Sequence, residues 1–199
     1  MPKFTEAEKA QIHQCLLTKG KELFSKYGLA KTSIDDIVLA CGIAKGSFYK
    51  FFSSKEELYY VILRHEEKIR EQVLGELLRE DLSPKELLTS FFKKSLQLVD
   101  ENPFLQLMFQ EGEYERIVRK LPPHLRQETA QEDVEKGMQA VVMLMQRGVL
   151  REEDPNVIVG VIKAIMMIRL HKEKIGADIF PDVMNQVIEH VVAGLAVER

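Results

Sequence analysis

The sequence predicts an all-α fold of about nine helices, three short ones followed by six longer ones. Apolar residues recur at spacings of three and four along most of the chain, which is the period of a helix with one buried face. Val, Ile and Thr do not alternate with polar residues as they would in a half-buried strand. With 199 residues, of which 45% are hydrophobic, the chain can bury one sizeable core, or one core and a small satellite.

The first helix is expected from about Glu6 to Tyr27, because its apolar residues share one broad face. Gly28 follows at the position where a left-handed residue often ends a helix. Next, Thr32 or Ser33 can cap a second helix, with carboxylates in its first turn that favour the positive end of the helix dipole. Gly42 ends that short helix, and a third short helix is expected over residues 44–52.

Capping residues and prolines divide the rest of the chain. Ser54 and Glu57 form a predicted capping box for a long fourth helix, and Ser83-Pro84 begins a fifth. Prolines then separate four further helical segments, at 104–120, 124–147, 155–174 and 180–197. We divide the chain into an N-terminal domain, residues 1–64, and a helical bundle, residues 65–199, with the boundary inside the fourth helix.

Composition favours a chain that stays in the reducing cytoplasm. The first ten residues carry no apolar stretch after their charges, so no signal peptide is expected. The most apolar stretch, 157–170, is short and carries Lys163 and Arg169, which indicates a buried helix and no membrane partner. Two cysteines, Cys15 and Cys41, cannot form a disulfide framework, and nothing nearby marks either thiol as activated.

Two short helices joined by a tight glycine turn, at about residues 33–52, are the minimal helix-turn-helix. Phe48 and Phe52, four residues apart, can pack inward and hold the second helix from behind. The opposite face then presents small, polar and cationic side chains to solvent or to a DNA groove. Residues 1–60 carry a net charge of +2 and the remaining 139 a net charge of -5, so only one end of the molecule suits phosphate.

The stretch TSIDDIVLACGIAKGSFYKFFSSKEEL, residues 32–58, resembles the signature of TetR-family transcriptional regulators, as does the preceding helix with its Tyr27-Gly28 end. The resemblance covers about the first third of the chain. It departs from the family at Lys50, where the family often has histidine. Because lysine can bind guanine edges or phosphate, the resemblance implies no base preference at this position. The resemblance implies a DNA-binding domain at the N-terminus and a regulatory and dimerisation bundle behind it.

The resemblance also implies which residues meet DNA. Thr32 and Ser33 would contact phosphate from the start of the second helix, and Lys55 would clamp the backbone from the start of the fourth. The surface facing the groove would be formed by Lys45, Gly46, Ser47, Tyr49 and Lys50, with Tyr49 commonly a phosphate contact. Glycine at position 46 lets the backbone approach DNA closely.

One helix-turn-helix neutralises too few phosphates for tight binding, whereas two of them about 34–36 Å apart, or a multiple of that distance, can read a palindrome. We therefore expect a homodimer on a double-stranded DNA operator, formed through helices 155–174 and 180–197. The first of these is apolar around nearly its whole circumference, and valines follow one stripe of the second. The resemblance adds a ligand-released repressor with an unidentified small-molecule effector in the bundle.

Two other classes of function compete with this interpretation. An all-helical enzyme would need convergent catalytic residues, but the bundle offers only scattered Glu, His and Arg, with no phosphate loop, GxSxG or CxxC motif. No enzymatic activity, cofactor or metal is therefore expected. A protein-interaction module would dock a partner helix on the same N-terminal helices, and its binding would depend far less on salt than phosphate binding does.

Overall fold

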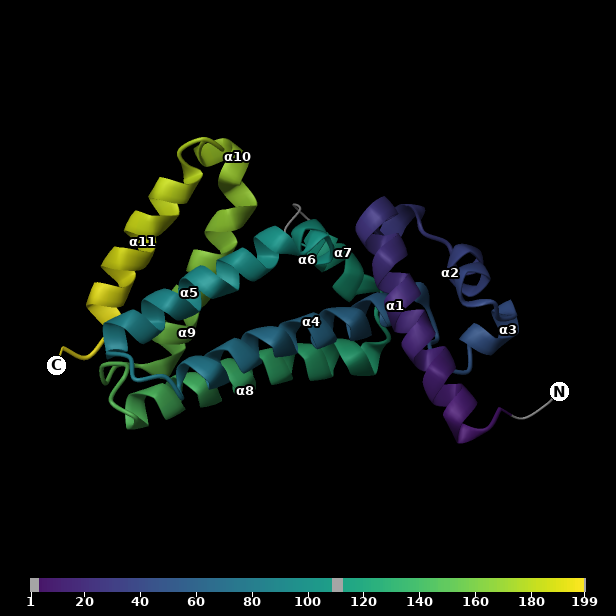
Figure 1. Cartoon of the computed structure of the whole chain (residues 1–199), viewed down its shortest axis with the longest axis horizontal. Coiled ribbons are helices and arrows are strands. Elements are labelled where there is room, and N and C mark those ends of the chain that lie inside the picture. Colours follow the sequence, from purple (N-terminus) through teal and green to yellow (C-terminus); the bar gives the residue numbers. More distant parts are fainter. Residues whose placement is uncertain (1–3, 109–112, 199) are drawn as a thin grey trace.

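The computed structural model describes residues 4–108 and 113–198. The molecule is elongated, with α1, α2 and α3 at one end and the C-terminus at the other (Figure 1). Along the chain, the elements are α1 (Glu6–Lys31), α2 (Ile34–Cys41), α3 (Lys45–Phe48), α4 (Lys55–Leu77), α5 (Pro84–Glu101), α6 (Pro103–Met108), α7 (Glu113–Lys120), α8 (Pro123–Gln146), α9 (Pro155–Ile168), the 3-10 helix η1 (Arg169–His171), α10 (Lys172–Ile175) and α11 (Phe180–Leu195).

The predicted all-α fold is confirmed. The described residues form eleven α-helices in place of about nine, because two expected segments are divided. The segment 104–120 comprises α6 and α7, with residues 109–112 outside the described part, and the segment 155–174 comprises α9, η1 and α10. Outside the helices, the described residues pair as strands only at one isolated bridge, between Leu150 and Ala196.

Helix starts follow the capping signals in the sequence. Ser33 is the cap of α2, since its side chain accepts from the backbone N–H of Asp36 and the Asp36 carboxylate returns to the Ser33 backbone. Of the two hydrogen bonds in the capping box expected at Ser54 and Glu57, only one forms. Ser54 accepts from the N–H of Glu57, but the Glu57 carboxylate binds the backbone N–H of Ser53 instead.

The third helix, α3, is shorter than expected. The sequence predicted helix over 44–52, whereas α3 ends at Phe48 and the chain continues in turns to Phe51. The physical reason is a change in hydrogen bonding. The N–H groups of Lys50 and Phe51 bond to carbonyls three residues back, which tightens the helix beyond α geometry.

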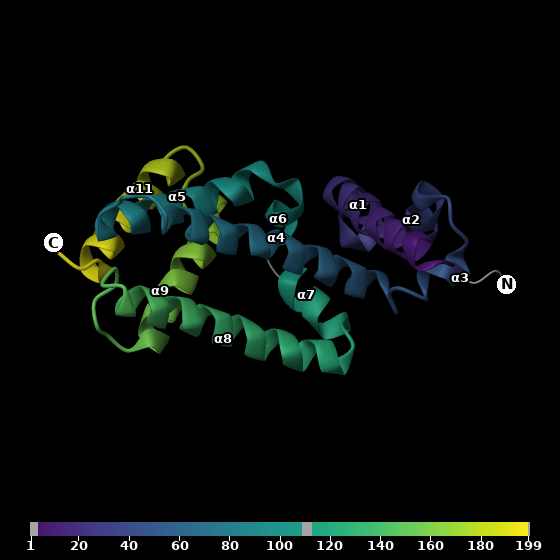
Figure 2. The same ribbon diagram turned by 60° about the horizontal axis from the view of Figure 1, so that its bottom comes forward.

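The chain buries two hydrophobic clusters, and α4 contributes to both. Leu58 and Ile62 lie in the cluster of the N-terminal domain, whereas Leu77 lies in the cluster of the helical body. The N-terminal cluster also includes Phe104 from α6 and Ile117 from α7. Figure 2 shows α4 running the length of the molecule, from the N-terminal helices toward the C-terminal end. A boundary inside the fourth helix is thus compatible with the packing, although residues far beyond position 64 complete the N-terminal core.

Candidate nucleic-acid interface

The turn between α2 and α3 is built on Gly42. This residue has a φ of 65° and a ψ of 30°, the left-handed region that a residue without a Cβ reaches at little cost. Its N–H bonds back to the end of α2, and the N–H of Ile43 donates to the carbonyl of Val38 at 3.0 Å. These bonds fix the direction in which α3 leaves α2.

The inner face of the α3 region is anchored by aromatic packing. Phe48 is fully buried and Phe52 nearly so, with ring centroids 6.0 Å apart. On the far side, the His13 ring of α1 stacks on Phe52 at 5.3 Å. The predicted inward packing of Phe48 and Phe52 is therefore confirmed, and it holds α3 rigidly against α1.

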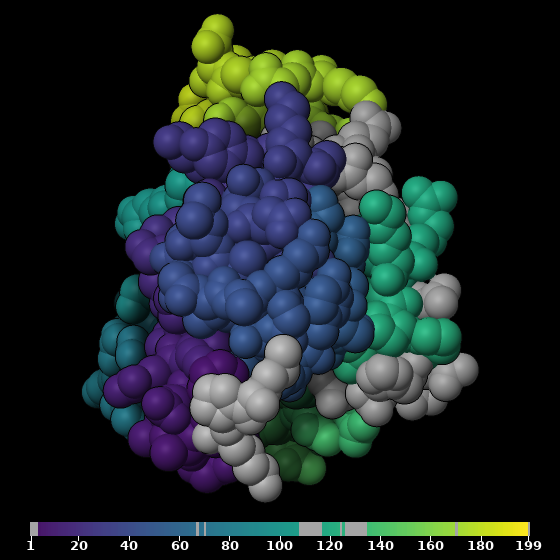
Figure 3. All heavy atoms as spheres, turned by 90° about the vertical axis from the view of Figure 1, so that its right-hand side faces the viewer, coloured from purple at the N-terminus to yellow at the C-terminus, as the bar shows by residue number. Residues whose placement is uncertain are grey.

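The outer face carries the residues that the sequence assigned to the DNA groove. Lys45, Gly46, Tyr49 and Lys50 are exposed, and Ser47 is half-buried. Tyr49 exposes 52% of its surface although its ring packs edge-on against Phe48. The space around Gly46 is open, since a Cβ there would meet nothing within 4 Å. Figure 3 looks onto this end of the molecule, where residues of the helix-turn-helix form the centre of the surface.

Both lysines of this face have neighbours within the chain. The Lys45 ammonium pairs with the Asp35 carboxylate at 2.8 Å, and this hydrogen bond raises the pKa of Lys45. The Lys50 ammonium lies 4.9 Å from the centroid of the Phe4 ring. Exposed pairs of this kind are weak because solvent screens them, so both cations can exchange their partners for a phosphate at small cost.

Thr32 and Ser33 differ sharply in exposure. Thr32 is 2% exposed, and its hydroxyl donates to the carbonyl of Gly28 at 2.9 Å, so it fastens the end of α1. Ser33 is exposed and caps α2. The hydrogen bonds that Asp36 accepts from Ser33 lower the pKa of this carboxyl. Phosphate contacts by either hydroxyl stay predictions.

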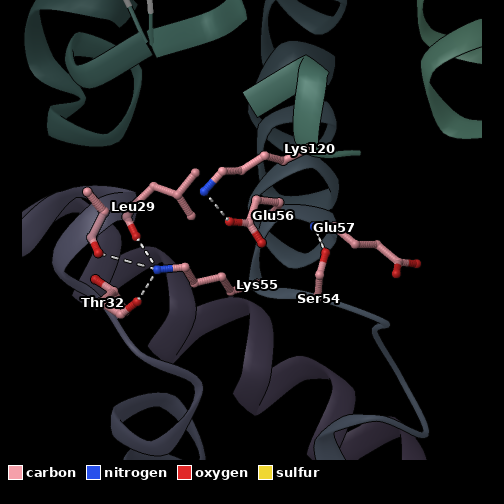
Figure 4. A network of polar contacts seen from close by, with 8 residues as sticks. Leu29, Thr32, Ser54, Lys55, Glu56, Glu57 and Lys120 are labelled. Carbon is pink, nitrogen blue, oxygen red and sulfur yellow. Dashed lines mark hydrogen bonds and ion pairs between the residues drawn. The ribbon is translucent and has the colours of Figure 1, made fainter. Parts of the chain in front are cut away.

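Lys55 reaches back from the start of α4 to the end of α1. Its ammonium lies 2.7 Å from the carbonyl oxygens of both Leu29 and Thr32, and 3.4 Å from that of Ala30 (Figure 4). Carbonyls at a helix C-terminus lack partners within the helix, and a cation stabilises them. Lys55 thus closes the corner between α1, α2 and α4, and its predicted phosphate contact would have to be made from this position.

Sequence reasoning missed three polar contacts, made by two glutamates of α4, that join the body to this unit. Glu66 of α4 pairs with Lys21 of α1 at 2.8 Å and also accepts from the side-chain amide of Asn102, before α6. Glu56, at the start of α4, pairs with Lys120 of α7 at 3.4 Å (Figure 4). The side chains of Glu66 and Glu56 are only 9% and 12% exposed, respectively. No local pattern could reveal these contacts, since in each of them the partners are 36 or more residues apart.

The thiols of Cys15 and Cys41 lie near each other, and that of Cys41 is not activated. Burial, and then a hydrogen bond with Cys15, raise the pKa of Cys41 to about 12. A thiol with such a pKa stays protonated at neutral pH and reacts slowly. Within residues 4–108 and 113–198, no three His, Cys, Asp or Glu side chains gather where they could hold a metal ion. In the same part of the chain, every helix is too short or too polar to span a bilayer.

A short helix fixed by a glycine turn and two buried phenylalanines, with a polar and cationic outer face, defines a helix-turn-helix domain. The sequence profile described as bacterial regulatory proteins of the tetR family matches residues 16–60. Over these residues, the chain is therefore similar to TetR-family regulators.

Curated relatives match parts of this chain. The chain is 45% identical over 58 residues to the uncharacterized HTH-type transcriptional regulator YvdT of Bacillus subtilis, covering 29% of this chain and 28% of that protein. It is 29% identical over 116 residues to the HTH-type transcriptional repressor KstR2 of Mycolicibacterium smegmatis, covering 57% and 55% of the two chains. The matches thus span between about a quarter and about half of these relatives.

Solved structures extend the likeness in fold to nearly the whole chain. A TetR-family regulator from Syntrophomonas wolfei superposes with a TM-score of 0.69 at 20% identity, over 93% of this chain and 94% of that one. A transcriptional regulator from Cytophaga hutchinsonii gives the same TM-score at 16% identity, over 92% and 98%. At these identities the likeness concerns the fold alone.

Proposed function

We propose that this chain is a sequence-specific DNA-binding transcriptional regulator, a ligand-released repressor that acts as a homodimer on a palindromic operator. The single observation that carries the proposal is the outer face of α3, which holds small, polar and cationic residues while buried phenylalanines fix the helix from behind. The relatives named as repressors support the sign of regulation, among them KstR2 and the probable acrEF/envCD operon repressor of Escherichia coli.

In the proposed complex, α3 enters the major groove. Lys45 and Lys50 would exchange their partners within the chain for phosphates or guanine edges, since lysine suits both. Tyr49 would donate its hydroxyl to a phosphate, and the open space at Gly46 would admit the DNA backbone. Ser33, exposed at the start of α2, is the second proposed phosphate contact.

The partner that we propose is a second copy, docked on α9 and α11. Both helices bury one side in the body core and turn another side outward. On α9, the outward side carries Val157 and Met167, which are 49% and 58% exposed, and Ile179, just before α11, is 55% exposed. Large apolar side chains left exposed near one another would be covered by a second copy. A dimer on these helices would set two reading faces for the two halves of a palindrome.

The proposed switch needs a small effector in the helical body. In a dimer, the two α3 faces can be spaced to fit the operator or spaced too far apart or too close to fit it. A ligand that binds the second state more tightly by about 1–3 kcal/mol would lower operator affinity by the corresponding factor. The body is joined to α1 and α4 by the contacts of Glu66 and Glu56, so a shift of α6 or α7 would reach the reading unit directly. A cytoplasmic location follows from this role, since a bacterial operator is reached there.

The test begins by selecting bound sequences from a random duplex pool with the full chain. We expect a palindrome whose half-sites lie one or more helical turns apart. Gel shifts on that duplex then compare three variants. Tyr49→Ala and Lys45→Gln are expected to abolish or strongly weaken the shift, whereas Lys94→Gln, on the body, is the matched control and leaves it unchanged.

Light scattering and circular dichroism show whether each variant remains a folded dimer. Specific binding that survives in both α3 variants would refute the placement of the reading face. Salt dependence distinguishes DNA binding from the alternative, a module that docks a partner helix. For DNA, the logarithm of the association constant should fall with log[salt] at a slope of about -0.9 per phosphate neutralised, whereas binding in an apolar groove would depend little on salt. For the dimer, Met167→Glu should give a monomer that has lost the operator shift.

A further inference from the structure

A half-open cavity of about 260 Å³ lies between α5 and the start of α11, and η1 and α10 each contribute one residue to its lining. In Figure 1, α5 and α11 separate from each other toward α10. The floor is apolar, since Phe180, Met184 and Ile188 are nearly fully buried. The cavity has no part in the DNA-binding surface, which lies at the other end of the molecule.

The rim of this cavity is cationic. It holds Lys93, Arg169 and Lys172 against the single carboxylate of Asp100. No ion pair joins Lys93 or Lys172 to another residue of the described chain, so two of the three cations are not neutralised locally. Low-dielectric walls lined by charges of one sign concentrate an oppositely charged ligand.

Arg169 is the anchor of the rim. Its side chain is only 12% exposed, and its guanidinium pairs with the carboxylate of Asp100, which is 53% exposed. A guanidinium offers five donors in a planar fork that matches a carboxylate on two atoms. Asp100 can turn into water at small cost, so an incoming carboxylate could replace it at Arg169 without leaving the buried cation unpaired.

We propose that this cavity binds a small amphiphilic carboxylate, whose head group takes the place of Asp100 at Arg169 and whose short tail lies on Phe180, Met184 and Ile188. The size of the cavity limits the tail. If each non-hydrogen atom takes about the 30 Å³ of a water molecule in the liquid, the cavity holds roughly nine. Hexanoate, with six carbons and two oxygens, fits this limit.

The position of Asp100 connects this cavity to the junction between the body and the DNA-binding end. It lies at the end of α5, where its backbone carbonyl accepts from the side chain of Gln106 in α6. Two residues later, Asn102 donates to Glu66, which pairs with Lys21 of α1. Release of Asp100 from Arg169 would therefore act on the junction that joins the body to the DNA-binding end. This consequence rests on the proposed function, whereas binding itself does not.

The experiment measures binding without DNA, so that its failure is distinct from failure of the proposed function. The protein, labelled with nitrogen-15, is titrated with hexanoate below its micelle-forming concentration, and with 1-hexanol as the uncharged analogue. We expect hexanoate to shift the side-chain N–H signal of Arg169 and the backbone signals of Leu96 and Met184. Hexanol should bind at least about tenfold more weakly, because it lacks the charge that the rim attracts.

Three variants are expected to differ in their affinity for hexanoate. Lys172→Gln should weaken hexanoate several-fold, whereas Asp100→Asn should tighten it several-fold, because it removes the competitor for Arg169. Lys94→Gln, next to Lys93 but outside the lining, is the matched control and should change nothing. Equal affinity for hexanol, signals that move elsewhere, or an Asp100→Asn variant that binds hexanoate no more tightly would each overturn the proposal.

Discussion

Replacing Phe104 by alanine should destabilise the N-terminal domain, although Phe104 lies 40 residues beyond position 64. Its side chain is fully buried, and its ring centroid is 4.5 Å from that of Tyr59 in α4. Tyr59 in turn meets Phe24 of α1 edge-on at 5.1 Å. Truncation of a buried phenylalanine to alanine costs about 3–5 kcal/mol, from lost burial and from the cavity left behind. That loss is a large share of a typical total stability of about 5–15 kcal/mol.

Urea unfolding followed by circular dichroism measures the loss, and hydrogen exchange locates it. We expect a lower midpoint for Phe104→Ala, with faster exchange in α1 and in the first half of α4. Phe91→Ala is the control, because Phe91 is only half-buried and packs on the body core, so it should cost less and leave α1 protected. A cost below about 1 kcal/mol, or faster exchange confined to the body, would refute the idea that α6 completes the N-terminal core.

Two further predictions concern the DNA-binding unit. Lys55→Met keeps the stem of the side chain but removes the bonds to the α1 carbonyls, so we expect a loss of about 1.5 kcal/mol in urea unfolding without DNA; unchanged stability would mean that Lys55 serves only phosphate. Ser33→Ala should raise the pKa of Asp36 toward its ordinary value in a carboxyl NMR titration, because the side-chain hydrogen bond, the larger of the two that lower it, is lost while the bond from the backbone N–H remains. Since the folded pKa is depressed, the stabilisation by Asp36 is present above its ordinary pKa and is lost as the pH falls through the folded value, and a variant with the same acid sensitivity as the parent would contradict this.

The sequence predicted the parts of the fold whose causes are local. The order α2, turn, α3 depends on a cap, a run of apolar residues at helical spacing and Gly42, all within ten residues of one another. The inward side of α3 could be predicted equally well, because two phenylalanines four residues apart must share a face. The resemblance to the TetR family could be recognised from the same short stretch.

The parts that the sequence did not predict depend on contacts between distant segments. The length of α3 is set by hydrogen bonds that tighten after Phe48, which no capping residue signals. Thr32 was one of two candidate caps for the second helix, yet it is buried, and its hydroxyl donates to carbonyls near the end of α1. The link from Glu66 to Asn102 joins residues 36 positions apart, and only the folded chain brings them together.

The start of α4 explains how one end of the molecule can respond to the other. Lys55 binds the carbonyls of Leu29 and Thr32, and the next residue, Glu56, binds Lys120 of α7. Two successive residues of one helix therefore hold the DNA-binding unit on one side and the body on the other (Figure 4). Because a helix start with its hydrogen bonds made cannot bend freely, a displacement of α7 would turn α4 and the end of α1 together. The orientation of α3 would then change without any change within the helix-turn-helix, as the repressor mechanism that we propose would require.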